Sequence, residues 1–250
     1  MAKAVTLNGV DHMTEASIIS PLDRLHQQFV LPILREDTAE AAWWCIEQLV
    51  AAQFQVIELT WTTPEASRIL RDAARQWPHV CFGAGSVQQE ANAKAAIEAG
   101  AKFLVSPSGL NTWVTALTDE ASAQGVVLIP GALTPTEIEA LAHSGASMVK
   151  VFPIQAVGGT SYLKAIMPPL KASEKQAKLL ATGGIDLSEV SAYRDAGAWA
   201  VGLGRCLFPN VFVASRDTHA LHTLWHEDLG WDVENGGFLD TSSTGVVAVQ

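Results

Sequence analysis

Two charged residues lie inside apolar, strand-like stretches of this 250-residue chain. Lys150 interrupts MVKVFPI (148–154), and Glu58 interrupts VIELTW (56–61). Burying a charge is costly, so such a group shifts its pKa or is used in chemistry. A neutral lysine amine in a dry pocket attacks a ketone to form a Schiff base, and a carboxylate moves the protons that this step and a C–C cleavage require. The pair predicts Schiff-base chemistry; the alternative is a buried structural ion pair, which is seldom favoured.

Glycine-containing loops follow the last two apolar runs, in ATGGI (181–185) and GLGR (202–205). Glycine lets backbone N–H groups approach an anion closely, and eight-stranded barrels often bind phosphate at these two loops. We therefore predict a phosphate site, with Arg205 adding a charge-assisted contact. The alternative is that these glycines only make tight turns. The predicted phosphate-binding residues are Thr182, Gly183, Gly184, Gly204 and Arg205.

Arg35 and Ser86 are further candidates because each ends an apolar run. Arg35 could hold a carboxylate or phosphate of the substrate, or form a surface ion pair with Glu36 or Asp37. Ser86 could line the pocket, cap the following helix, or do both. Its motif, GAGS (83–86), lacks the spacing of a dinucleotide-binding fingerprint.

The elements that must position these residues alternate regularly along the chain. Eight apolar, strand-like runs are separated by helix-like segments, several of which end on glycine. The runs cover residues 29–35, 56–61, 80–86, 102–108, 126–132, 148–154, 178–184 and 199–205. This pattern predicts an α/β fold, an eight-stranded parallel (β/α)8 TIM barrel, with a doubly wound open sheet as the alternative.

We expect three segments in the chain: an N-terminal lead-in (1–28), the (β/α)8 barrel (29–216) and a C-terminal extension (217–250). The lead-in is expected to place a short helix over the bottom of the barrel. In the helix after residue 133, Thr134 and Glu137 have capping-box spacing. The tryptophans are expected to pack rather than stack on substrate.

The net charge of −10 argues against nucleic acid and anionic membranes as partners. No segment looks like a signal peptide or a membrane span. The three cysteines are far apart in apolar segments, without CxxC or nearby metal-spaced histidines. We therefore expect reduced thiols, a cytoplasmic location and no metal site.

Taken together, these residues resemble the 2-keto-3-deoxy-6-phosphogluconate (KDPG) / 4-hydroxy-2-oxoglutarate (KHG) aldolase family of class I lyases. The motifs that carry the resemblance are VIELTWTTP, FGAGSV, SPSGL, LIPGALTPTE, VKVFPIQAVGG and ATGGI. They occur in family order from about residue 30 to residue 208 and cover most of the chain.

The resemblance implies a homotrimeric barrel and a metal-free mechanism without a cofactor. In that mechanism Lys150 forms the Schiff base with the 2-keto group, and Glu58 is the acid/base that permits release of an aldehyde and pyruvate. Phe152, Pro130 and Ser86 would border the pyruvate side of a small phosphorylated 2-keto acid.

Three positions depart from the family pattern. Thr62 stands where an arginine usually contacts the substrate carboxylate, so Arg35 would substitute for it. The SPSGL loop contains an additional residue, Ser108, and Arg205 stands where serine is usual. The family branch that acts on 2-keto-3-deoxy-6-phosphogalactonate also lacks the strand-two arginine, so that epimer is a rival substrate. KHG cleavage, oxaloacetate decarboxylation and a barrel that binds a phosphorylated metabolite without turning it over are three more hypotheses.

Overall fold

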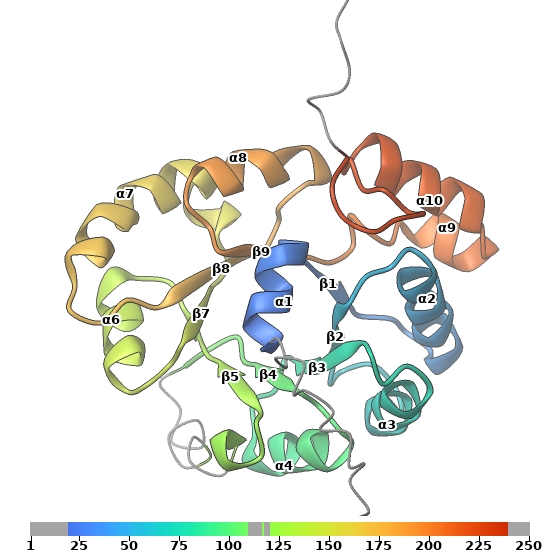
Figure 1. Cartoon of the computed structure of the whole chain (residues 1–250), viewed down its shortest axis with the longest axis horizontal. Helices are drawn as coiled ribbons and strands as arrows, with labels where there is room; N and C mark the ends of the chain where they lie inside the picture. The colour runs from blue at the N-terminus through green and yellow to red at the C-terminus, as the bar shows by residue number, and fades with distance from the viewer. Residues whose placement is uncertain (1–19, 110–116, 118–120, 240–250) are drawn as a thin grey trace, which may run out of the picture.

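Parallel strands form a ring with helices on its outside in the computed structural model, which describes residues 20–109, 117 and 121–239 (Figure 1). The strand order is β5-β4-β3-β2-β1-β9-β8-β7-β6. The strands are β1 (Val30–Leu34), β2 (Val56–Thr60), β3 (Cys81–Gly85), β4 (Phe103–Val105), β5 (Val127–Ile129), β6 (Gly131–Ala132), β7 (Met148–Val151), β8 (Lys178–Thr182) and β9 (Ala200–Leu203).

Pro130 explains why nine labelled strands occupy eight positions in the ring. This residue, which has no N–H group to donate, lies at the break that divides one strand into β5 and β6. β5 pairs with β4, and β6 pairs with β7. The backbone N–H of Lys150 in β7 donates to the Pro130 carbonyl over 2.8 Å, so β7 is also bonded to the residue between β5 and β6. The ring is therefore closed, which confirms the predicted (β/α)8 barrel over the open sheet.

The helices alternate with the strands and cover the outside of the ring (Figure 1). Their positions agree with the predicted helix-like segments, and the Thr134–Glu137 capping box is confirmed at the start of α6. After α1 (Pro21–Gln28), they are α2 (Ala39–Ala51), α3 (Ala66–Gln76), α4 (Glu90–Glu98), α6 (Pro135–His143), η1 (Gln155–Val157), α7 (Gly159–Ala172), η2 (Leu187–Glu189), α8 (Val190–Asp195), α9 (Asn210–Ser215) and α10 (Thr218–Glu227).

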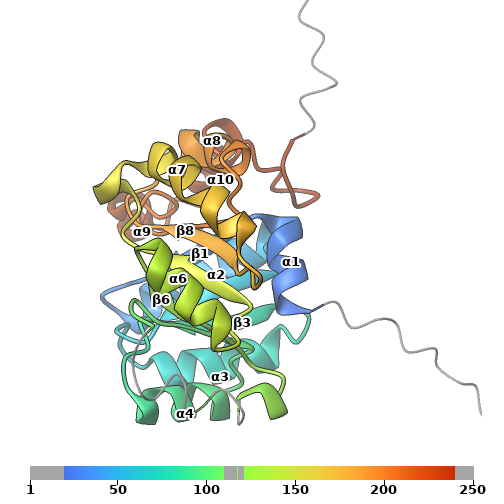
Figure 2. The same cartoon turned by 90° about the vertical axis from the view of Figure 1, so that its left-hand side faces the viewer.

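α1 covers one end of the barrel, in the centre of the ring in Figure 1 and at its side in Figure 2. Leu22 and Leu25 pack into an apolar cluster with strand residues such as Leu31 and Met148. The Gln28 side chain donates to the carbonyls of Val30 and Val56 over 2.7 and 2.8 Å. The described part of the lead-in thus closes the bottom of the barrel and leaves the carboxyl ends of the strands open.

The described part of the predicted C-terminal extension also packs on the barrel. Trp225 in α10 is fully buried and donates its indole N–H to the Leu207 carbonyl. Trp231 stacks on Phe54 with ring centroids 4.1 Å apart and donates to the Ala52 carbonyl. These tryptophans are packing residues, as expected. The division of the chain after residue 216 stays a prediction.

Candidate active site

Lys150 lies on β7, in register with Gly131 of β6 and Leu180 of β8. It is 6% exposed, and its Nζ atom lies 5.1 Å from the centroid of the Phe152 ring. Among the described residues, no carboxylate forms an ion pair with this ammonium-bearing side chain. A lysine amine shielded from water is the kind of group that can attack a carbonyl carbon.

Glu58 lies on β2 and is completely buried. Neither of its carboxylate oxygens has a hydrogen-bond partner among the described residues. Desolvation by burial raises the pKa of Glu58 above its ordinary value, while the positive charges of Lys150 and Arg35 act in the opposite direction. An unpartnered buried carboxyl group with a raised pKa is suited to accept and donate protons.

Gly85 makes room for the Glu58 carboxylate. A Cβ atom added at Gly85 would lie 1.7 Å from Glu58 Oε1, far inside van der Waals contact. Gly85 is not among the predicted site residues. The signal that could have found it is its place in β3: Gly85 is the register partner of Thr60, which lies two residues after Glu58 on the same face of β2.

A cavity of about 370 Å³ opens at the carboxyl ends of the strands. It brings Lys150 together with Arg35, Phe152 and all five residues predicted to bind phosphate. Ile33, Ile185, Asp186, Gly202 and Cys206 also line it and were not predicted. The full lining is Ile33, Arg35, Lys150, Phe152, Thr182, Gly183, Gly184, Ile185, Asp186, Gly202, Gly204, Arg205 and Cys206.

Arg35 reaches across the strand ends to two hydroxyl groups. Its Nη1 donates to Thr62 Oγ1 over 2.9 Å, and its Nη2 donates to Ser86 Oγ over 2.8 Å. The structure therefore joins three of the predicted substrate-binding residues. Both hydroxyls are neutral, so the guanidinium charge remains available for an anionic substrate group.

Two of the alternatives considered for Arg35 and Ser86 do not hold. Within the described part of the chain, Arg35 forms no ion pair with Glu36 or Asp37, and Glu36 pairs instead with Arg205. Ser86 does not cap the following helix, because α4 begins later and has Gln89 at its N-cap. The hydroxyl of Ser86 is directed to Arg35 because the strand ends at Gly85 and the chain turns there, with Ser86 at φ +56°.

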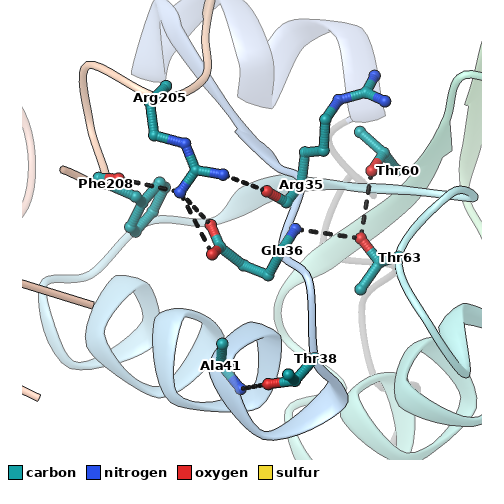
Figure 3. Close-up of polar contacts among 8 residues, drawn as sticks. All are labelled: Arg35, Glu36, Thr38, Ala41, Thr60, Thr63, Arg205 and Phe208. Atoms are coloured by element: carbon teal, nitrogen blue, oxygen red, sulfur yellow. Dashed lines mark hydrogen bonds and ion pairs between the residues drawn. The ribbon is translucent and has the colours of Figure 1, made fainter. Parts of the chain in front are cut away.

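Arg205 is held in place by three groups (Figure 3). Its Nη1 lies 3.1 and 3.3 Å from the two carboxylate oxygens of Glu36 and donates to the Phe208 carbonyl over 3.2 Å. Its Nη2 donates to the Arg35 carbonyl over 2.7 Å. Glu36 is not among the predicted site residues. Burial raises the pKa of Glu36, and the nearby Arg205 opposes that shift.

The remaining predicted residues take different positions. The Thr182 hydroxyl is buried, lines the cavity and has no hydrogen-bond partner among the described residues. Pro130 is buried outside the cavity lining and contributes its carbonyl to the Lys150 backbone. Phe152 is 37% exposed and walls the cavity beside Lys150.

Over the described ranges, no group of three or more His, Cys, Asp or Glu side chains could hold a metal ion. None of the helices in those ranges is both long and apolar enough to cross a membrane. Cys45, Cys81 and Cys206 are free thiols, and burial raises the pKa of Cys206, in the cavity lining, to about 11. A thiol with that pKa is a poor nucleophile at neutral pH.

Comparisons with known proteins show the family of this chain. The model of the KDPG and KHG aldolase family matches residues 22–224. A 2-dehydro-3-deoxy-phosphogluconate aldolase of Treponema pallidum is 32% identical over 176 residues, which cover 70% of this chain and 80% of that protein. The KHG/KDPG aldolase of Escherichia coli K12 is 32% identical over 167 residues, covering 66% and 73%.

A Rhizobium meliloti protein named "Probable 2-dehydro-3-deoxy-6-phosphogalactonate aldolase" is 29% identical over 199 residues, covering 78% of this chain and 89% of that one. Among solved structures, the KDPG aldolase of Legionella pneumophila superposes with a TM-score of 0.70 at 26% identity, covering 82% of this chain and 96% of that one. That crystal structure holds pyruvate captured as a covalent carbinolamine intermediate.

Proposed function

Because this chain belongs to the KDPG and KHG aldolase family, and is therefore a lyase, we propose that it cleaves KDPG to pyruvate and glyceraldehyde 3-phosphate through a Schiff base on Lys150. The observation that carries the proposal is the position of Lys150. This amine is 6% exposed and lines a cavity that also contains Arg35 and the glycine loops after β8 and β9.

In the first half of the proposed reaction, the Lys150 Nζ attacks C2 of the 2-keto acid. The carbinolamine loses water, and a protonated imine (iminium) remains. Glu58 then accepts the proton of the C4 hydroxyl, directly or through water, and the C3–C4 bond breaks. The electron pair of that bond moves into the iminium, so an aldehyde and an enamine are formed.

In the second half, C3 of the enamine takes up a proton, for which protonated Glu58 is the proposed source. Water then adds to C2 of the iminium, and its collapse releases pyruvate and returns Lys150 as the free amine. The raised pKa of Glu58 supports this double use, because a carboxyl group must bind the proton between the two steps.

For the two ends of the substrate, we propose separate binding groups. Arg35 binds the carboxylate in place of the missing strand-two arginine, supported by its bonds to Thr62 and Ser86. The backbone of Gly183, Gly184 and Gly204, with Thr182 and Arg205, binds the phosphate, since all five line the cavity.

The 6-phosphogalactonate epimer is the second candidate substrate. Thr62 favours it, because the resemblance implies that this family branch also lacks the strand-two arginine. The relative from Rhizobium meliloti carries the corresponding name.

A substrate panel tests the proposal. Pyruvate release, coupled to lactate dehydrogenase, is measured with KDPG, its C4 epimer, KHG, oxaloacetate and unphosphorylated 2-keto-3-deoxygluconate. We expect the highest kcat/KM with KDPG and no pyruvate release with Lys150→Ala. A higher kcat/KM with the epimer would assign the second candidate, and turnover by Lys150→Ala would contradict the Schiff base.

A further inference from the structure

The Glu36–Arg205 ion pair lies at the edge of the substrate cavity. A smaller cavity of about 180 Å³ adjoins the main one, because Ile33, Arg35, Gly204 and Arg205 line both. The Glu36 side chain lines only the smaller cavity. A buried negative charge therefore lies next to the end of the cavity proposed to bind phosphate.

Arg205 does not depend on Glu36 alone for its position. The carbonyls of Arg35 and Phe208 accept two further hydrogen bonds from the same guanidinium, as Figure 3 shows. An uncharged amide at position 36 would still present an oxygen to Nη1, and the two carbonyls would remain. The negative charge of Glu36 is thus more than the geometry of Arg205 requires.

The charge of Glu36 changes the field in this part of the cavity. Its side chain is 6% exposed and that of Arg205 is 45% exposed, so the carboxylate is fixed beneath a partly solvated cation. With one positive and one negative charge, the pair presents no net charge to a phosphate. Asp186, also in the lining, adds a further negative charge. The neutral N–H groups of the glycine loops remain as the main anion-binding groups.

We propose that Glu36 determines specificity: its carboxylate neutralises Arg205 and lowers the preference of the enzyme for phosphorylated over unphosphorylated 2-keto acids. This inference rests on the proposed function, in which the phosphate lies at the loops after β8 and β9. Glu36 acts through Arg205 and touches no reacting atom.

The test compares kcat/KM for KDPG with that for 2-keto-3-deoxygluconate in wild-type and Glu36→Gln protein. Removing one negative charge near a phosphate is expected to raise this ratio about tenfold, mainly through a lower KM for KDPG. Asp37→Asn is the matched control, because it removes the same charge one residue along without a bond to Arg205, and its ratio should change far less.

A second pair of variants tests the same inference from the side of Arg205. Arg205→Gln leaves the Glu36 carboxylate without its cation and should lower the ratio about tenfold. The double variant Glu36→Gln, Arg205→Gln should return it towards the wild-type value. An unchanged or lower ratio in Glu36→Gln would overturn the inference, and so would a double variant that is no better than Arg205→Gln.

Failure of this inference can be distinguished from failure of the proposed function. Borohydride reduction with pyruvate reports the Schiff base on Lys150 and involves no phosphate. If the adduct forms in all variants but the ratio does not move, only the role of Glu36 is wrong. If wild-type protein forms no adduct, the proposed function itself fails.

Discussion

Two buried carboxylates, Glu58 inside the barrel and Glu36 at its rim, have opposite surroundings. Glu58 is 0% exposed and has no hydrogen-bond partner among the described residues, whereas Glu36 is 7% exposed and binds Arg205 through both oxygens. Burial raises the pKa of each. This difference supports the two proposals that Glu58 transfers protons and that Glu36 supplies a fixed charge.

The largest expected difference between the two carboxylates is in turnover. Glu58→Gln should lower kcat about a hundredfold or more, because the amide cannot accept the proton of the C4 hydroxyl. Glu36→Gln should change kcat by a much smaller factor and act mainly on KM. Steady-state kinetics with KDPG measures both. Equal losses of kcat in Glu58→Gln and Glu36→Gln would contradict the proposal that Glu58 transfers protons and Glu36 does not.

Gly85 offers a way to disturb Glu58 without replacing it. Because a Cβ atom at position 85 would overlap the Glu58 carboxylate, Gly85→Ala should lower kcat about tenfold or more and reduce the free energy of unfolding. The three closest contacts of that Cβ atom all belong to Glu58, so Gly85→Ala with Glu58→Ala should recover stability but not turnover. A double variant as unstable as the single one would show that the clash lies elsewhere.

The pH dependence of catalysis separates the two carboxylates further. If ionised Glu58 is the base, kcat/KM should fall on acidification at a pH above the ordinary pKa of a glutamate, because burial raises the pKa of Glu58. The positive charge of Arg35 lowers that pKa, so Arg35→Met should move the acidic limb to higher pH. Glu36→Gln should leave the acidic limb of the kcat/KM profile at its wild-type pH. An acidic limb that moves to lower pH in Arg35→Met would contradict this explanation of the Glu58 pKa.

The smallest expected effect is on stability. A carboxyl whose pKa is raised by folding binds its proton more tightly in the folded state, so its contribution to stability falls as pH rises through the raised pKa. Glu58→Gln should therefore raise the free energy of unfolding at pH 7 by about 1 kcal/mol, and the gain should shrink on acidification. In Glu36→Gln, the loss of the ion pair with Arg205 destabilises the protein, whereas the relief of desolvation stabilises it. We therefore expect the free energy of unfolding to change by no more than about 0.5 kcal/mol. Urea denaturation at several pH values measures both, and a destabilised Glu58→Gln would contradict the prediction.

Much of the fold and part of the site could be predicted because strand periodicity and strand ends are local features of the sequence. Each of the eight apolar runs contains strand residues of the barrel, and Lys150, Arg35 and the glycine loops end at one cavity. Closure of a parallel barrel makes residues that end different strands neighbours, so their types alone indicated a shared site.

The partners of Arg35 and Arg205 could not be predicted in the same way. The sequence suggested Glu36 or Asp37 as partners for Arg35 because they are its neighbours in the chain. Arg35 and Glu36 follow β1 directly, and their side chains point to different sides of the chain (Figure 3). Arg35 meets hydroxyls 27 and 51 residues away, and Glu36 meets Arg205, 169 residues away.

The most direct test of the central claim is reduction with borohydride in the presence of pyruvate, followed by intact mass measurement and peptide mapping. The account predicts one stable, pyruvate-sized adduct per chain, located on Lys150, and no adduct in Lys150→Ala. It also predicts that Glu58→Gln and Glu36→Gln retain the adduct. An adduct on another lysine, or none in the wild-type protein, would contradict the claim that Lys150 is the Schiff-base residue.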